Sequence, residues 1–164
     1  MLDHENANKI HQLFCKTPAE PTSEDAITNA ESQLGSVFPV DYREYLLAYN
    51  GGKFSGMGIN IPGDRCANYS IRYIYSLGDA SEYRNLLHRC ESFGHSYSNF
   101  NYPNTDSLFP IAGMSDGSWV CLERSRSRTA NAVYFGELFE EPYKICDSFN
   151  ELLTLLVPWD SIGT

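Results

Sequence analysis

The chain has few basic residues for its length. Its 164 residues include 12 Lys and Arg against 21 Asp and Glu, which gives a formal net charge of −9. Proteins that bind nucleic acid or anionic membranes need a basic surface, so this balance argues against both kinds of partner. It is typical of an ordinary acidic protein, and it also suits a protein that binds a basic protein partner. The charge alone leaves both interpretations open.

Long apolar runs and paired cysteines are also lacking. No segment approaches the roughly 20 apolar residues of a membrane span, and the first residues do not form a secretory signal. The cysteines are odd in number and contain no Cys-x-x-Cys pair, which predicts free thiols in a reducing, cytoplasmic location. They are Cys15, Cys66, Cys90, Cys121 and Cys146. The last two lie in apolar runs and are expected in the core.

One catalytic motif occurs, but the other features that it needs are missing from the sequence. Residues 113–117 read Gly-Met-Ser-Asp-Gly, the pattern of a nucleophile elbow, which needs a strand before it and a helix after it. The next residues, 118–122, predict a strand, and no histidine follows His95, whereas an α/β-hydrolase has its base after the serine. We therefore predict a hairpin turn and a protein that is not an enzyme. The histidines and cysteines show no zinc-like spacing, so we expect no metal and no cofactor.

Two short helices are clearly marked in the N-terminal half. The first follows Thr22 and Ser23, which are candidate N-cap residues, and ends at Gly35. The second begins with Pro39 and Asp41, expected as N-terminal proline and capping carboxylate, and ends at the Asn-Gly-Gly of residues 50–52. Its apolar stripe is Tyr42, Tyr45, Leu46 and Tyr49.

The remaining pattern predicts strands between helices. We expect a helix around Ile10, Leu13 and Phe14, a helix from Asp79 or Ser81 to about Glu91 that buries Tyr83, and a terminal helix capped by Ser148. The terminal helix should bury Phe149, Leu152, Leu153 and Leu156. Strands are expected at residues 57–61, 70–77, 109–112, 119–123, 132–135 and 143–146, and a long loop at 92–107. This order predicts one α+β domain, a central, largely antiparallel sheet with helices at both chain ends packed around it.

The ordered motifs resemble those of a known family. The N-terminal set comprises Pro21, Glu24, Asp25, Ile27, Glu31, Leu34, Gly35, Phe38, Pro39, Asp41, Tyr42, Asn50, Gly51 and Gly52. Further matches are residues 109–112, 116–118, 120–122, 133–134 and 147–153. Together they are similar to the SUKH superfamily, which includes bacterial immunity proteins against polymorphic toxins and yeast regulators of cell-wall synthesis. Trp119 and Glu123 depart from the family pattern, and residues 53–108 match poorly.

The resemblance implies a function and a domain division. It implies a non-catalytic protein-binding domain, an immunity protein that neutralises a cognate bacterial toxin, often a nuclease, by direct binding. The alternative is a regulatory or scaffolding module related to the cell-wall regulators. We assign residues 1–20 to an N-terminal extension or helix, residues 21–157 to the SUKH-like domain and residues 158–164 to a C-terminal tail. The oligomeric state is left open.

Two charged segments are candidates for contact with a partner. Glu137, Glu140 and Glu141 flank two apolar residues, Leu138 and Phe139, which suits an acidic patch for a basic protein, although these two residues could equally belong to the core. With Asp116 in the expected turn, the three glutamates are our predicted partner-binding residues. Arg124, Arg126 and Arg128 alternate with serines and are expected at the solvated tip of a hairpin loop rather than in a strand that clasps an anion.

Overall fold

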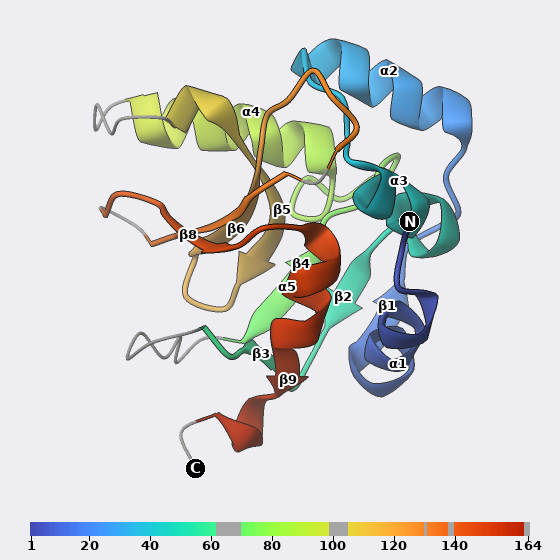
Figure 1. Cartoon of the computed structure of the whole chain (residues 1–164), viewed down its shortest axis with the longest axis vertical. Coiled ribbons are helices and arrows are strands. Elements are labelled where there is room, and N and C mark those ends of the chain that lie inside the picture. The colour runs from blue at the N-terminus through green and yellow to red at the C-terminus, as the bar shows by residue number, and fades with distance from the viewer. Residues whose placement is uncertain (62–69, 99–104, 130, 138–139, 163–164) are drawn as a thin grey trace.

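A seven-stranded antiparallel sheet forms the centre of the computed structural model, which describes residues 1–61, 70–98, 105–129, 131–137 and 140–162 (Figure 1). The sheet has the order β1-β2-β4-β5-β6-β7-β8. These strands are β1 (Cys15–Pro18), β2 (Gly52–Phe54), β4 (Ile71–Ile74), β5 (Leu108–Met114), β6 (Trp119–Glu123), β7 (Val133–Gly136) and β8 (Tyr143–Cys146). A separate antiparallel pair joins β3 (Met57–Ile59) to β9 (Leu156–Pro158).

Helices come before, between and after the strands. They are α1 (His4–Phe14), α2 (Glu24–Leu34), α3 (Val40–Tyr49), α4 (Leu86–Ser98) and α5 (Phe149–Leu155), with 3₁₀ turns η1 (Thr105–Ser107) and η2 (Trp159–Ser161). Ser23 and Ser148 cap α2 and α5 as predicted, because their hydroxyls accept hydrogen bonds from Ala26 N and Glu151 N. Gly35 and Asn50 end α2 and α3 in the left-handed conformation. The sheet and helices confirm the predicted α+β class.

Aromatic side chains fill the core between the sheet and two of the helices. Tyr42 and Tyr45 of α3 lie 5.1 Å and 4.9 Å, ring centre to ring centre, from Phe149 of α5. Phe38 stacks on Phe109 of β5 at 5.5 Å. All five rings are buried, so α3 and α5 pack on the same face of the sheet.

The expected position of α4 was wrong. The helix begins at Leu86, after Asn85, whose side-chain oxygen accepts a hydrogen bond from His88 N. Asp79 instead accepts from Ser81 N within a turn, and Tyr83, expected in the core, is 69% exposed. Because α4 extends to Ser98, the first part of the expected loop at 92–107 is helical, and residues 99–104 lie outside the described residues.

Several short elements were also missed. β1, β2 and β9 contain only three or four residues each, and Leu156, expected in the last helix, belongs to β9. The helix expected around Ile10, Leu13 and Phe14 is present as α1; Ile10 and Phe14 are buried and Leu13 is 53% exposed. The first residues are attached to the helices beside them, since Asn150 of α5 accepts a hydrogen bond from Asp3 N and donates one to the carbonyl of Met1. Figure 1 shows the N-terminus beside α3, where Leu2 N donates a hydrogen bond to the Glu44 carboxylate.

Candidate functional site

Glu31, one of the N-terminal motif residues, carries a buried charge that stabilises the fold. The Glu31 carboxylate is 6% exposed and accepts hydrogen bonds from Phe38 N at 2.8 Å, Arg43 Nη1 at 3.1 Å and Arg128 Nη1 at 2.7 Å. Burial alone would raise the pKa of Glu31, but the hydrogen bonds from Arg128 and Phe38 and the charges of both arginines outweigh it and lower the pKa. Glu31 therefore holds α2, α3 and the β6–β7 loop together.

Asn50, Gly51 and Gly52 also serve the fold. The Asn50 amide donates to the carbonyls of Glu20 and Leu77, and its oxygen accepts from Leu77 N. Gly51 has φ +77°, and a side chain there would clash with the backbone of β4. The Asn-Gly-Gly motif thus lets β2 lie close to both of its neighbouring strands.

The expected role of Asp41 was only partly right. Pro39 stands at the N-cap position of α3 and makes no side-chain capping bond. One Asp41 oxygen accepts from Tyr42 N, and the other accepts from Asn150 N at 3.0 Å, in the first turn of α5. Asp41 therefore connects the starts of two helices that are more than 100 residues apart in sequence.

The Gly-x-Ser-x-Gly segment is a hairpin turn. β5 and β6 pair antiparallel on either side of it, which confirms the predicted strand after the serine and removes the geometry of a nucleophile elbow. Ser115 Oγ accepts a hydrogen bond from Ser70 N at 3.3 Å. The Asp116 carboxylate accepts from both Ser118 N and Ser118 Oγ, at 3.1 and 2.7 Å, and shapes the turn while remaining exposed.

The four predicted partner-binding residues lie at one end of the sheet. Asp116 is in the β5–β6 turn, and Glu137, Glu140 and Glu141 are in the β7–β8 loop. The two connections share an end because Trp119 pairs with Gly136, which places Glu137 across from Ser118. Glu140 and Glu141 are exposed and Glu137 is half-buried. Leu138 and Phe139 lie outside the described residues, and the role of this acidic end stays a prediction.

The arginine segment lies in a loop as predicted, but Arg124 is half-buried there and Arg128, although exposed, is held by an ion pair. Arg124 donates through Nη1 to the Leu34 carbonyl and through Nε to the Leu108 carbonyl. Arg128 pairs with Glu31. Both side chains fasten the β6–β7 loop to the C-terminal half of α2, while Arg126 is exposed. The sequence could not show this, because the partners are about 90 residues away.

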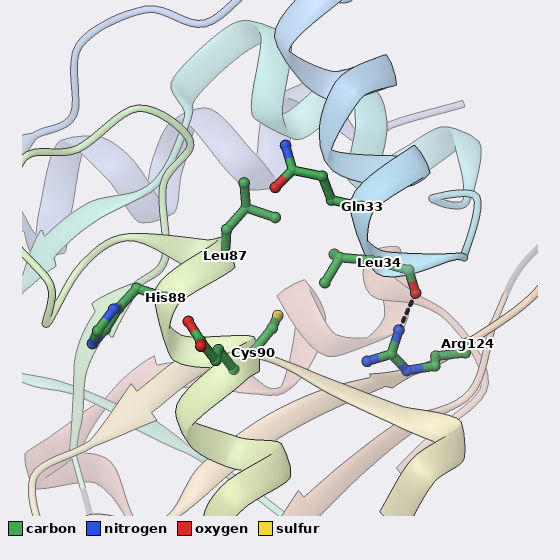
Figure 2. Close-up of a pocket in the computed structure, with 7 residues that line it drawn as sticks. Gln33, Leu34, Leu87, His88, Cys90 and Arg124 are labelled. Carbon is green, nitrogen blue, oxygen red and sulfur yellow. Dashed lines mark hydrogen bonds between the residues drawn. The ribbon is translucent and has the colours of Figure 1, made fainter.

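A cavity of about 470 Å³ opens between α2 and α4 (Figure 2). It was missed because its walls come from three distant segments: Gln33 and Leu34, residues 87–91 and Arg124. In Figure 2 the Cys90 thiol points from α4 toward the side of Leu34, and the Arg124 guanidinium lies below Leu34 and donates to its carbonyl. Burial raises the pKa of Cys90 to about 12 despite the positive charge of Arg124, so the thiol is a poor nucleophile.

His11 and His88 lie in different surroundings. His11 of α1 packs against Tyr49 with 4.3 Å between ring centres, and its Nε2 lies 2.7 Å from Tyr45 Oη. His88 lies 3.8 Å from Glu82. The buried Cys121 and Cys146 are core residues, as predicted. Among the described residues, no three His, Cys, Asp or Glu side chains gather in a way that could hold a metal ion.

These features define an α+β domain whose sequence motifs stabilise its own fold. The chain belongs to the SMI1 / KNR4 family (SUKH-1), whose model matches residues 21–155. The family covers toxin immunity proteins and cell-wall regulators, and its members are generally non-catalytic. No curated protein matches the chain. None of the helices in the described ranges is long and apolar enough to cross a membrane.

Proposed function

We propose that this protein is a non-catalytic cytoplasmic immunity protein that binds a cognate basic toxin, such as a nuclease, and blocks it by occluding its active surface. The family match over residues 21–155 carries the proposal, because the family includes proteins of this kind. The net charge of −9 adds the expectation that the partner's surface is positively charged. An acidic surface attracts a basic one before contact and raises the association rate.

The internal contacts of the motif residues favour a partner surface elsewhere. Glu31, Asp41 and Asn50 are all engaged in hydrogen bonds within the domain. The acidic end formed by Asp116, Glu137, Glu140 and Glu141 combines exposure with charge of one sign, and we propose it as part of the partner surface. Occlusion needs no reacting group from the inhibitor, only a complementary surface of sufficient area.

If a toxin gene lies beside the gene for this protein, co-expression with its toxin domain tests the proposal. The toxin domain alone should stop growth, and co-expression of this protein should restore it. The purified proteins should form a complex in which the toxin's activity is lost. Growth arrest despite stable co-expression, or a complex that retains full toxin activity, would contradict the proposal.

The regulatory module remains the second candidate, because the same family covers regulators of cell-wall synthesis. A regulator should bind several client proteins without abolishing an enzymatic activity. A gene for a toxin beside the gene for this protein would favour immunity. Binding to several unrelated clients with similar affinity would favour the regulatory role.

A further inference from the structure

Helix α4 covers only the middle of one face of the sheet. Phe93 of α4 lies edge-on to Trp119 of β6 at 5.4 Å, and Cys90 Sγ lies 3.9 Å from the Pro110 carbonyl of β5. On either side of α4 the same face carries a half-buried tyrosine, Tyr73 on β4 and Tyr134 on β7. Each flank of the helix therefore carries one partly exposed tyrosine on this face.

The strand register establishes that the two tyrosines share this face. Tyr134 pairs with Cys121 on one side and Lys144 on the other, and Cys121 alternates with Trp119 along β6. Tyr73 pairs with Gly113, which pairs with Trp119. Cross-strand partners and every second residue of a strand point to the same face.

The charges around the two tyrosines are opposite. Tyr73 lies under the guanidinium of Arg72, 5.6 Å from the ring centre, and directly opposite Lys53. Tyr134 lies directly opposite Lys144, whose charge is paired with that of Asp147. The hydrogen bond to Asp147 raises the pKa of Lys144, and the nearby Glu123 adds to this effect.

We propose that Tyr134 is the anchor of the partner-binding surface, and that a basic side chain of the toxin packs on its ring beside Glu123. This inference rests on the proposed function. Charge complementarity selects the Tyr134 flank: Glu123 and the acidic end at Glu137, Glu140 and Glu141 favour a cation there, whereas Arg72 and Lys53 repel one at Tyr73. Tyrosine is enriched among residues that dominate binding energy, and its ring face attracts Lys and Arg.

The surface is a sheet face and not a sheet edge. β8 is an edge strand with a bulge against β7, an exposed Lys144 and a proline, Pro142, just before it. Bulges, lysines and prolines hinder the addition of another strand. A partner is therefore expected to contact side chains on this flank rather than to extend the sheet.

The test measures binding to the purified toxin domain of the adjacent gene, inactivated at its own catalytic residue. Tyr134→Ala should raise the dissociation constant at least tenfold, and Glu123→Lys should raise it by a similar factor. Tyr73→Ala is the matched control, a half-buried tyrosine on the same face, and should change the constant less than threefold. Thermal melting establishes that each variant is folded.

The outcomes separate this site from the proposed function. If the wild-type protein binds and Tyr134→Ala keeps its affinity, or Tyr73→Ala loses as much, the site is wrong and the proposed function stands. If Tyr134→Ala does not fold, Glu123→Lys decides, and wild-type affinity in that variant overturns the site. If the wild-type protein does not bind the toxin domain, both proposals fail.

Discussion

At the scale of single residues, some of the predicted residues contact close neighbours in sequence and others contact residues far away in sequence. The caps at Ser23 and Ser148 and the left-handed stop at Gly35 depend on neighbours within four residues, so the sequence predicted them. Glu31 accepts hydrogen bonds from Arg43 and Arg128, which are 12 and 97 residues away. No local pattern distinguishes such a buried carboxylate from one on a helix surface.

Glu31→Gln should lower the free energy of unfolding by about 2 kcal/mol, because a neutral amide loses the charge-assisted hydrogen bonds that the buried Glu31 carboxylate makes with Arg43 and Arg128. Its lowered pKa means that the contribution of Glu31 is present above the unfolded-state value and is lost as the pH falls through the folded-state value. Glu24→Gln is the control, since Glu24 also pairs with Arg43 but is 63% exposed. Urea unfolding at several pH values measures both. Equal losses in the two variants would contradict the assignment.

Loss of the hydroxyl should have different effects on stability at two neighbouring tyrosines of α3. Tyr42 Oη is buried and has no hydrogen-bond partner among the described residues, whereas Tyr45 Oη is bonded to His11. Tyr42→Phe should leave the free energy of unfolding unchanged or raise it by about 1 kcal/mol, and Tyr45→Phe should lower it by about 1 kcal/mol. Chemical denaturation measures both values. A loss of more than 1 kcal/mol in Tyr42→Phe would show that its hydroxyl is bonded.

At the scale of elements, length and capping decided what the sequence could predict. β6 and β8 were predicted with their observed bounds, because each is a short run rich in apolar or aromatic residues between turn residues. β1 and β2 are an edge strand and its neighbour, with only four and three residues, and offer no periodicity to detect. The start of α4 was misplaced because Ser76 bonds to the carbonyl of Arg84 and holds the preceding turn out of the helix.

The docking of α1 on α3 should weaken in acid. His11 is enclosed by Tyr45, Tyr49 and Phe54, and burial lowers its pKa to about 4. Between about pH 6.5 and 4 the unfolded chain binds a proton that the folded protein excludes, so stability falls as the pH drops through this range. His11→Phe should remove that part of the pH dependence. Urea unfolding from pH 7 to 4 compares the two proteins, and an identical slope in the variant would contradict this account.

At the scale of the whole molecule, charge is divided across the sheet. The exposed charged side chains of β1, β2 and β4 are Lys16, Lys53 and Arg72, while the β7–β8 loop carries only glutamates among its described charged residues. The sequence gives the net charge, but only the strand order places the basic strands β1, β2 and β4 on the opposite side of the sheet from the glutamates of the β7–β8 loop. This separation gives the molecule a direction from which a basic partner is attracted.

Reversing the charge of Glu137, Glu140 and Glu141 together to Lys should slow association with the toxin domain at least tenfold at low salt, with little change in melting temperature. The difference from wild type should shrink as salt rises, since the Debye length falls to about 8 Å at physiological ionic strength. The control reverses Glu20, Glu82 and Asp160, which are exposed elsewhere and change the net charge equally, from −9 to −3. Stopped-flow mixing measures both rates. Local steering predicts a smaller effect for the control. Equal slowing would mean that net charge, and not the acidic end of the sheet, directs the encounter.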